Sequence, residues 1–238
     1  MYAALRQRAC APGAAGAFPA WIAWVLAGWL SLASAAAADG ARSARVVLER
    51  NTGGTWAAVD PRTVLRSGDT VRFRFEANFA GYLYVLNQTS KGEYLWLFPT
   101  PETGLENAIE AGREYAIPST EGAFRIPPSE GFDTVYWIVS PLKLPELPAT
   151  PAPPAPPRAK GDSPLRPRCQ AGPLRARGLC LDDTAGARAL RGAERLPQGL
   201  AAPVPDAGQL TVERGETDNR ITSGGEGPFV YEFRIAHR

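Results

Sequence analysis

Hydrophobic and polar side chains alternate along much of the first 140 residues, and the alternation has a period of two. The clearest stretch runs from residue 66 to residue 99 and reads RSGDTVRFRFEANFAGYLYVLNQTSKGEYLWLFP. Successive side chains of a β-strand point to opposite faces of a sheet, so this period indicates strands rather than helices. We predict three successive antiparallel strands, at residues 71–75, 82–86 and 94–98.

These three strands differ in how polar their faces are. The first carries Arg72, Arg74 and Glu76 between its apolar residues, so one of its faces contacts water. The second and third are apolar on both faces, which is typical of strands covered on both sides or held between two sheets. We therefore predict an all-β fold, an immunoglobulin-like antiparallel β-sandwich with this meander at its core.

Shorter alternating runs predict the remaining strands of the sandwich. They lie at residues 45–50, 55–59, 111–118, 123–126, 134–140, 209–213 and 228–236. Short strands at this spacing are typical of immunoglobulin-like sandwiches. The last run alternates as strongly as the central ones, and we expect it to pair with an edge of the sandwich.

The alternation stops between residues 142 and 205. Residues 141–157 are rich in proline and predict a stiff, extended tract of polyproline II type. From residue 143 to residue 201 there are few large apolar side chains, and ten basic residues face five acidic ones. Such a region buries too little apolar surface to offset the entropy of ordering it. We expect a largely irregular, flexible insertion with at most one short helix, at residues 182–191, capped by Asp183 or Thr184.

Residues 1–38 have the features of a secretory signal peptide. A positively charged start is followed by an apolar stretch at residues 21–32 and by small residues at 33–38 that offer cleavage sites. We expect an exported protein, periplasmic or extracellular. The alternative is an uncleaved anchor in the inner membrane, because residues 18–38 are long enough to span a bilayer.

The expected organisation after the leader is one domain with a long excursion. Residues 39–141 form the core of the sandwich, residues 142–205 the Pro/Arg-rich insertion, and residues 206–238 the C-terminal strands that complete the sandwich.

Charge argues against a nucleic-acid partner. The formal net charge is +2, and both excess charges lie in the leader, at Arg6 and Arg8. The remaining 24 Lys and Arg balance 24 Asp and Glu, whereas nucleic-acid binders carry a strong basic excess. Membrane contact is expected only through an uncleaved leader or through the basic insertion.

Cysteine and histidine are too few for most catalytic or metal sites. Cys10 lies in the leader, and an exported chain is expected to join Cys169 and Cys180 in a disulfide, the alternative being two free thiols. The chain has no C-x-x-C motif, and its only histidine is His237, next to last, where chain ends fray. We therefore predict no metal, no cofactor and no catalytic residue.

Two other groups of side chains leave alternatives open. Neighbouring carboxylates such as Asp182 and Asp183 are expected at the solvated surface, or as the acids of a hydrolase or carbohydrate-active enzyme if two carboxylates share a cleft. Seven aromatic residues cluster in three strands and form either core or a sheet face that binds a peptide, a glycan or a partner domain. They are Tyr82, Tyr84, Tyr94, Trp96, Phe98, Tyr136 and Trp137, and the five binding candidates among them are Tyr82, Tyr84, Tyr94, Trp96 and Trp137.

Four motifs carry a family resemblance. Ser67-Gly68-Asp69 precedes a V-R-F strand, residues 78–87 read NFAGYLYVLN, residues 97–99 read LFP, and residues 111–118 read AGREYAIP. In this order they resemble the bacterial domain of unknown function 4384, over roughly residues 45–140. The resemblance implies export or a place beside other modules, and it carries over no catalytic residue. The Pro/Arg-rich insertion departs from the family pattern.

The expected function is a binding or structural role for an exported, non-enzymatic β-sandwich in the cell envelope, with an envelope protein, peptide or glycan as partner. One alternative is the carboxylate-based hydrolase or carbohydrate-active enzyme. The other is an envelope scaffold whose basic, Pro-rich segment contacts anionic wall or lipid.

Overall fold

The computed structural model describes six stretches of the chain. They are residues 40–101, 106–119, 121–145, 166–169, 179–190 and 210–238. The chain divides into two units, and all six stretches belong to the second, residues 40–238. The expected leader and most of the proline-rich tract lie outside the described residues. In the described part, no helix is long and apolar enough to cross a membrane.

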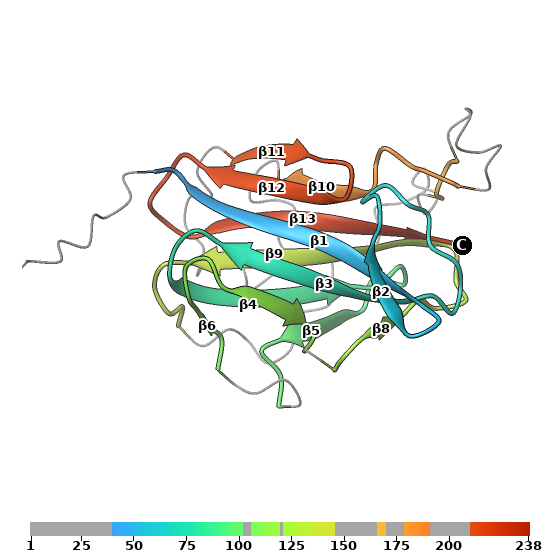
Figure 1. Ribbon diagram of the computed structural model, residues 1–238, viewed down its shortest axis with the longest axis horizontal. Helices are drawn as coiled ribbons and strands as arrows, with labels where there is room; N and C mark the ends of the chain where they lie inside the picture. The colour runs from blue at the N-terminus through green and yellow to red at the C-terminus, as the bar shows by residue number, and fades with distance from the viewer. Residues whose placement is uncertain (1–39, 102–105, 120, 146–165, 170–178, 191–209) are drawn as a thin grey trace, which may run out of the picture. The chain divides into compact units, whose positions relative to one another are not determined.

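Two antiparallel sheets pack as a sandwich, which confirms the predicted fold, and the described stretches contain no helix (Figure 1). The first sheet has the order β11-β12-β1-β3-β7, with β2 beside β1 and β8 beside β3. Its strands are β1 (Arg42–Thr52), β2 (Thr55–Ala58), β3 (Thr70–Ala77), β7 (Glu114–Ile117), β8 (Phe124–Arg125), β11 (Leu210–Arg214) and β12 (Asp218–Ser223). The second sheet has the order β10-β13-β9-β4-β5, with β6 beside β4. Its strands are β4 (Gly81–Gln88), β5 (Tyr94–Phe98), β6 (Ala108–Ile109), β9 (Gly131–Ser140), β10 (Gly186–Ala189) and β13 (Phe229–His237).

Alternate side chains of both sheets meet in one apolar core. Trp137 of β9 stacks on Phe75 of β3, with 5.5 Å between ring centroids, and on Tyr231 of β13 at 5.9 Å. Phe73 meets the same indole ring edge-on at 5.2 Å. All four side chains are fully buried, and aromatic contacts of this geometry add to the stabilisation from buried area. This stack fixes which face of each contributing strand points inward.

The meander predicted for residues 71–98 is only partly correct. β4 and β5 pair with each other, but β3 belongs to the first sheet and β4 to the second. The chain crosses between the sheets after Asn78, whose side chain accepts the backbone N–H of Ser43 in β1. It enters β4 at Gly81, where an added Cβ would lie 2.3 Å from the carbonyl oxygen of Ser140 in β9. Glycine at this position therefore allows β4 to approach β9 closely.

The C-terminal strand β13 joins the sandwich as predicted, but it does not lie at an edge. It pairs with β9 on one side and with β10 on the other. β10 comes from the segment expected to be irregular, so the short helix expected at residues 182–191 is wrong. Asp182 bonds to the backbone of Thr184 as a helix cap would, yet it closes a single turn. Gly186 then takes a φ of 86°, which lies outside the helical region.

The two sheets are joined by hydrogen bonds along one side of the sandwich and are separated by a groove along the other. On one side the sheets are joined, because Ala187 of β10 donates to Asn219 of β12 at 3.4 Å and Arg214 of β11 donates to the Ala187 carbonyl at 3.2 Å. On the other side, residues of β5 in the second sheet and β8 in the first line a groove of ≈ 370 Å³.

Candidate functional site

The two outer faces of the sandwich differ in chemistry. The outward side chains of the first sheet are charged and form ion pairs across neighbouring strands. The pairs are Arg45 with Asp218 (2.9 Å), Arg72 with Glu49 (2.6 Å) and Arg74 with Glu114 (3.0 Å). The guanidinium of Arg72 also lies over the ring of Trp56, 4.3 Å from its centroid. This is the polar surface that the outside of a two-layer sandwich normally presents to water.

The outward side chains of the second sheet are mostly aromatic and aliphatic. They lie on the side of the sheet opposite the core, and we call this cluster the outer aromatic face. It consists of Tyr82, Tyr84 and Leu86 from β4, Tyr94 and Trp96 from β5, Tyr136 and Ile138 from β9, and Val230 from β13. Strand pairing makes the cluster continuous, because Leu86 is opposite Trp96 on β5 and opposite Tyr136 on β9.

The tyrosines of this face carry hydroxyl groups that bind neighbouring polar atoms. Tyr136 donates to the side-chain oxygen of Gln88 at 3.1 Å, and the Tyr84 hydroxyl accepts the backbone N–H of Leu144 at 3.1 Å. Burial raises the pKa of Tyr94, and a hydrogen bond with Gln88 offsets part of that rise. The face therefore offers flat rings with hydroxyl tips, which suits an apolar ligand with backbone-like hydrogen-bonding groups.

Several side chains of the outer aromatic face are buried although they point away from the core. Tyr84 is 7% exposed, Tyr136 is 5% exposed, and the three aliphatic members are 0% exposed. Among the described residues outside the face, Leu144 and Leu190 pack against it. Leu190 directly precedes one undescribed stretch, residues 191–209, and Leu144 lies close before another, residues 146–165. Both of these contacts on the face thus come from residues that lie outside the strands.

One end of the face carries a buried group of charges. Glu232 of β13 is 3% exposed and pairs with Arg234 at 3.2 Å and with Arg188 of β10 at 3.9 Å. Glu232 is opposite Tyr136 in the pairing of β13 with β9, so the charges adjoin the aromatic residues. A ligand on this face would meet rings over β4, β5 and β9, and charge over β10 and β13.

Four of the five aromatic residues predicted as binding candidates lie together here. Tyr82, Tyr84, Tyr94 and Trp96 belong to the outer aromatic face, whereas Trp137 lies in the core between the sheets. Tyr136, which belongs to the predicted aromatic cluster but not to the five binding candidates, also lies on this face. The strand period predicts that residues 136 and 137 point to opposite faces, but only the packing of the two sheets shows that Trp137 is the one in the core.

The carboxylates considered for an enzyme are engaged in local contacts. Asp182 is 5% exposed and accepts the backbone N–H groups of Arg168 at 2.6 Å and of Thr184 at 2.8 Å. Burial favours its neutral form, but hydrogen bonds from Thr184 and Arg168 outweigh burial and hold the pKa of Asp182 below its ordinary value. Asp183 pairs with Arg62 at 3.5 Å. Asp182 is ionised and its oxygens already accept hydrogen bonds. It therefore suits a structural role better than that of a general acid, which must carry a proton to donate.

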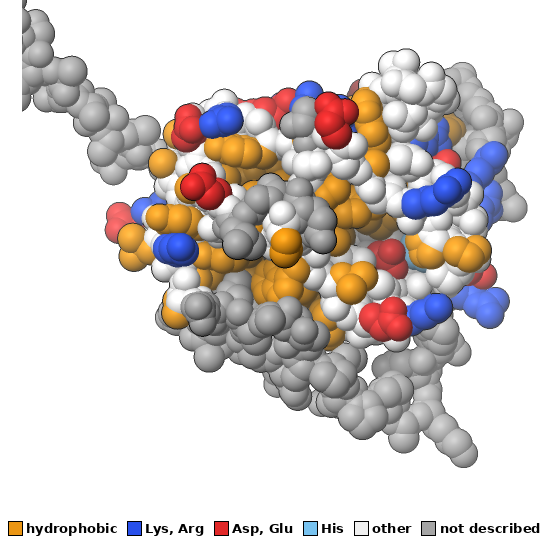
Figure 2. Space-filling model, turned by 90° about the horizontal axis from the view of Figure 1, so that it is seen from below, with side chains coloured by type: hydrophobic (Ala, Val, Ile, Leu, Met, Phe, Trp, Pro, Cys, Tyr) orange, Lys and Arg blue, Asp and Glu red, His pale blue; other side chains and the backbone are white. Residues whose placement is uncertain are grey.

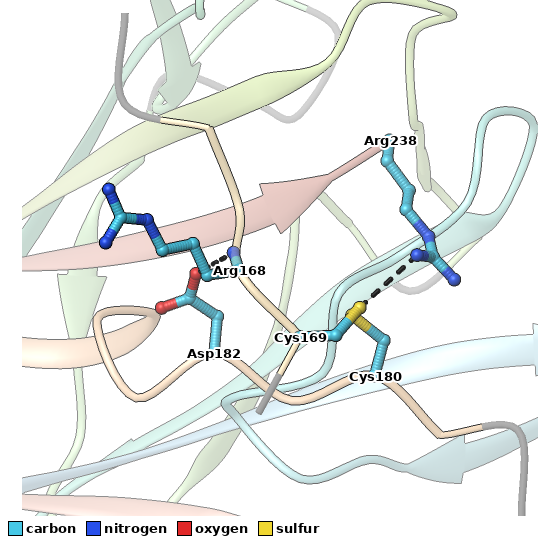
Figure 3. The surroundings of a disulfide bond; sticks show 5 residues. All are labelled: Arg168, Cys169, Cys180, Asp182 and Arg238. Atoms are coloured by element: carbon cyan, nitrogen blue, oxygen red, sulfur yellow. Dashed lines mark hydrogen bonds between the residues drawn. A yellow bond between two sulfur atoms is a disulfide. The ribbon is translucent and has the colours of Figure 1, made fainter. Parts of the chain in front are cut away.

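Cys169 and Cys180 form the predicted disulfide (Figure 3). It ties residues 166–169 to the stretch that contains β10. Arg238 donates to the sulfur of Cys169 at 3.3 Å, and Cys180 packs in a small cluster with Val64 and Ala236. The disulfide therefore joins two parts of the inserted segment, and non-covalent contacts with Val64, Ala236 and Arg238 connect it to the sandwich.

The C-terminal end of β13 is not frayed, contrary to expectation. His237 is fully buried, with Nδ1 2.7 Å from the Ser129 carbonyl and Nε2 3.3 Å from a carboxylate oxygen of Asp133. Burial lowers the pKa of His237, but the hydrogen bond and charge of Asp133, together with the Ser129 carbonyl, outweigh burial and raise it. Both ring nitrogens face acceptors, so the protonated ring is favoured and serves as an anchor. No group of three or more His, Cys, Asp or Glu side chains within the described stretches is placed to hold a metal.

The groove between β5 and β8 is a concave, largely apolar surface. Figure 2 views the unit from the side on which these strands lie, and hydrophobic side chains gather in the middle of that view. Leu95 and Leu97 line the groove on one side and Phe124 on the other. Of the described residues that line it, Asp133 is the only carboxylate, and it is bound to His237. Glycoside hydrolysis requires two carboxyl groups in one cleft, so these lining residues do not provide that arrangement.

Residues 64–143 match the family model described as Domain of unknown function (DUF4384), which confirms the resemblance drawn from the motifs. The match spans β3 to β9 and includes every residue of the outer aromatic face except Val230. No curated protein and no solved structure matches the chain. The match thus identifies a domain whose description names no activity.

Proposed function

We propose that this chain is a non-catalytic binding module of the bacterial cell envelope and that the outer aromatic face is its contact surface. The observation that carries the proposal is the contrast between the outer faces: ion pairs cover the first sheet, while aromatic and aliphatic side chains cover the second. Three aromatic members of the face, Tyr82, Tyr94 and Trp96, are half-exposed and can contact a partner, and aromatic residues supply much of the binding energy at interfaces.

The chemistry of the face narrows the class of partner. Flat rings with hydroxyl tips bind ligands that present apolar surface beside hydrogen-bonding groups, as extended peptides and glycans do. The buried pairing of Glu232 with Arg234 at one end adds a polar margin. The partner is therefore a protein segment, a peptide or a glycan of the envelope.

Two features support a place outside the cytoplasm. The first 38 residues have the pattern of a signal peptide, and the Cys169–Cys180 disulfide is typical of oxidising compartments. The proposed compartment is the periplasm or the cell exterior.

A matched pair of tryptophans tests the contact surface. Trp96 belongs to the outer aromatic face, Trp56 lies beside Arg72 on the first sheet, and both are half-buried. Immobilised mature protein would be incubated with envelope extract, and its reproducible partner quantified. We expect Trp96→Ala combined with Tyr82→Ala to weaken capture about tenfold or more, because interface aromatic residues contribute on the order of 1–2 kcal/mol each or more. Trp56→Ala should leave capture unchanged.

Equal losses from both variants, or full capture by the variant of Trp96 and Tyr82, would reject the outer aromatic face as the contact surface. Reproducible turnover of a small substrate by the purified protein would reject the non-catalytic role.

A further inference from the structure

The strand β5 borders the groove and lies at an edge of the second sheet. Within the described part of the chain it pairs with β4 on one side and with no strand on the other. An edge strand directs the backbone N–H and C=O groups of alternate residues away from its sheet, where an added strand can pair with them. Many proteins protect such edges with charged side chains or proline, but residues 94–98 read YLWLF and contain neither.

The side chains of β5 alternate between two surfaces. Tyr94 and Trp96 belong to the outer aromatic face, whereas Leu95 and Leu97 line the groove. Leu95 is 54% exposed, and Phe124 of the two-residue strand β8 lines the groove from the first sheet. Apolar side chains from both sheets therefore bound the groove, and a strand laid beside β5 would direct every second side chain towards it.

The few polar groups of the groove favour a ligand with a negative charge. Its carboxylate among the described lining residues, Asp133, lies 3.3 Å from Nε2 of His237, which offsets its charge. Arg125 of β8 is exposed and forms no ion pair with the residues that the structure describes. Asn87 of β4 also lines the groove, and its side-chain oxygen is buried without a hydrogen-bond partner in the same residues. A suitable ligand brings a carboxylate to Arg125 and a hydrogen-bond donor to Asn87.

We infer that the groove is a docking site for an extended segment of a partner protein, which adds to the free edge of β5 as an antiparallel strand. The segment has apolar side chains at every second position and an acidic residue beside Arg125. In this mode of recognition, backbone hydrogen bonds provide affinity and the alternate side chains provide specificity. The inference goes beyond the proposed contact surface and is independent of it, because Leu95 and Leu97 point to the opposite side of β5 from Trp96.

The size of the groove favours a single segment over a second folded copy of the chain. Its volume of ≈ 370 Å³ lies near the lower end of the range for ligand pockets, about 300–1,000 Å³, so it admits the side chains of one segment. A second copy would offer only an edge of its sandwich, because its described strands are already paired within two sheets. The occupant is therefore an unpaired segment of a different protein.

Synthetic peptides test this docking mode. In the first peptide, valine alternates with threonine before a terminal glutamate, and a fluorescein label reports binding to the purified protein by anisotropy. The second peptide has the same residues with its valines in one block, and the third has glutamine in place of glutamate. Successive residues of a strand direct their N–H groups to opposite edges. N-methylation of all the valines and N-methylation of all the threonines therefore block opposite edges of the first peptide, and only one of these edges faces β5.

The expected result is selective binding of the alternating peptide. We expect the peptide with blocked valines to bind at least about tenfold more weakly, because a contact that buries an aliphatic side chain contributes about that factor. One N-methylated peptide should lose binding, and the other should keep it. The peptide with glutamine should bind two- to fivefold more weakly at low salt and equally at high salt, as expected for an exposed ion pair.

Two exposed leucines supply matched protein variants. Leu142 is 74% exposed and does not line the groove. Leu95→Glu should weaken binding of the alternating peptide about tenfold or more, because it removes an apolar contact and places a charge in an apolar groove. Leu142→Glu should leave binding unchanged. Arg125→Gln should remove the preference for glutamate over glutamine, and thermal melts report whether each variant is folded.

Several results would overturn the inference. They are equal affinity for the alternating and blocked peptides, equal loss from the two N-methylated peptides, and equal effects of Leu95→Glu and Leu142→Glu. A dimer in sedimentation velocity that Leu95→Glu dissociates would make the occupant a second copy. Binding that appears only after residues 146–165 are replaced by a Gly/Ser linker would make the occupant a segment of this chain. Capture that depends on Trp96 and Tyr82 would leave the proposed function standing in each of these cases.

Discussion

Replacing Tyr231 with phenylalanine should stabilise the protein. Tyr231 is fully buried in the core, where its ring stacks on Trp137 at 5.9 Å with 3° between the ring planes. Its hydroxyl has no hydrogen-bond partner among the described residues. Burial raises the pKa of Tyr231 well above its ordinary value, so the group is a neutral hydroxyl held in an apolar site. Phenylalanine keeps the ring and its stacking and removes the unpaired group.

The magnitude follows from the cost of burying a polar group. A buried hydroxyl without a partner costs about 1–3 kcal/mol, and the ring contacts are unchanged by the substitution. We expect Tyr231→Phe to raise the free energy of unfolding by about 1–2 kcal/mol. For a domain of this length that corresponds to a rise in Tm of about 2–8 °C.

Urea unfolding of the purified protein, followed by circular dichroism, measures this change as a higher midpoint at an unchanged slope. The matched control is Tyr84→Phe, because the Tyr84 hydroxyl accepts the Leu144 N–H at 3.1 Å. That variant should lose about 0.5–1.5 kcal/mol. A destabilised Tyr231→Phe protein, or changes of the same sign in both variants, would refute the reasoning and indicate a hydroxyl with a bound partner.

Three further predictions concern other parts of the fold. Replacing both Cys169 and Cys180, 11 residues apart, with serine should lower the free energy of unfolding by roughly 2–3 kcal/mol, and reducing agent should then have no further effect in thermal melts. Because the folded-state pKa of His237 is raised, its contribution is fully present below about pH 6.5 and is lost as pH rises through the folded pKa. Urea titrations should therefore show wild-type stability falling above about pH 6.5 while His237→Gln, which removes the only histidine, stays flat. Gly81→Ala should cost roughly 1–3 kcal/mol or prevent folding, because the new Cβ would lie 2.3 Å from the Ser140 carbonyl oxygen, and an unchanged Tm would contradict this.

The hydrophobic pattern predicts strands well, but it does not assign their faces when both are apolar. In β9 the sequence offers Tyr136 on one face and Trp137 on the other, and either set of side chains would make a core. The choice depends on packing between the sheets. The indole ring of Trp137 stacks on Phe75 of the opposing sheet and on Tyr231 of the neighbouring strand β13. Tertiary packing of this kind has no local signature in the sequence.

For a related reason, the hydrophobic pattern does not predict which sheet each strand joins, and it does not predict the short strand β10. The crossing between β3 and β4 depends on the contact of Asn78 with Ser43, 35 residues away in the chain. Three of the four residues of β10 are small, and its site is tight: Ala187 is fully buried, and a Cβ on Gly186 would lie 3.1 Å from the Cβ of Pro61. Small side chains fit such a site but leave no hydrophobic alternation to read.

The outer aromatic face could be predicted from the sequence only in part. Aromatic residues in β4 and β5 indicate a cluster, and the sandwich architecture then places Tyr84 and Trp96 on its outside. The contact of Leu144 with Tyr84 could not be predicted, because it depends on how the chain turns after Ser140.

Photo-crosslinking in cells that produce the full chain tests most directly whether the outer aromatic face is the contact surface. The photoreactive residue p-benzoylphenylalanine would replace Tyr82 on that face or, as the matched control, Trp56 on the first sheet. We predict light-dependent adducts to a second protein from position 82, and none from position 56. Equal adducts from both positions, or none from position 82, would contradict the assignment.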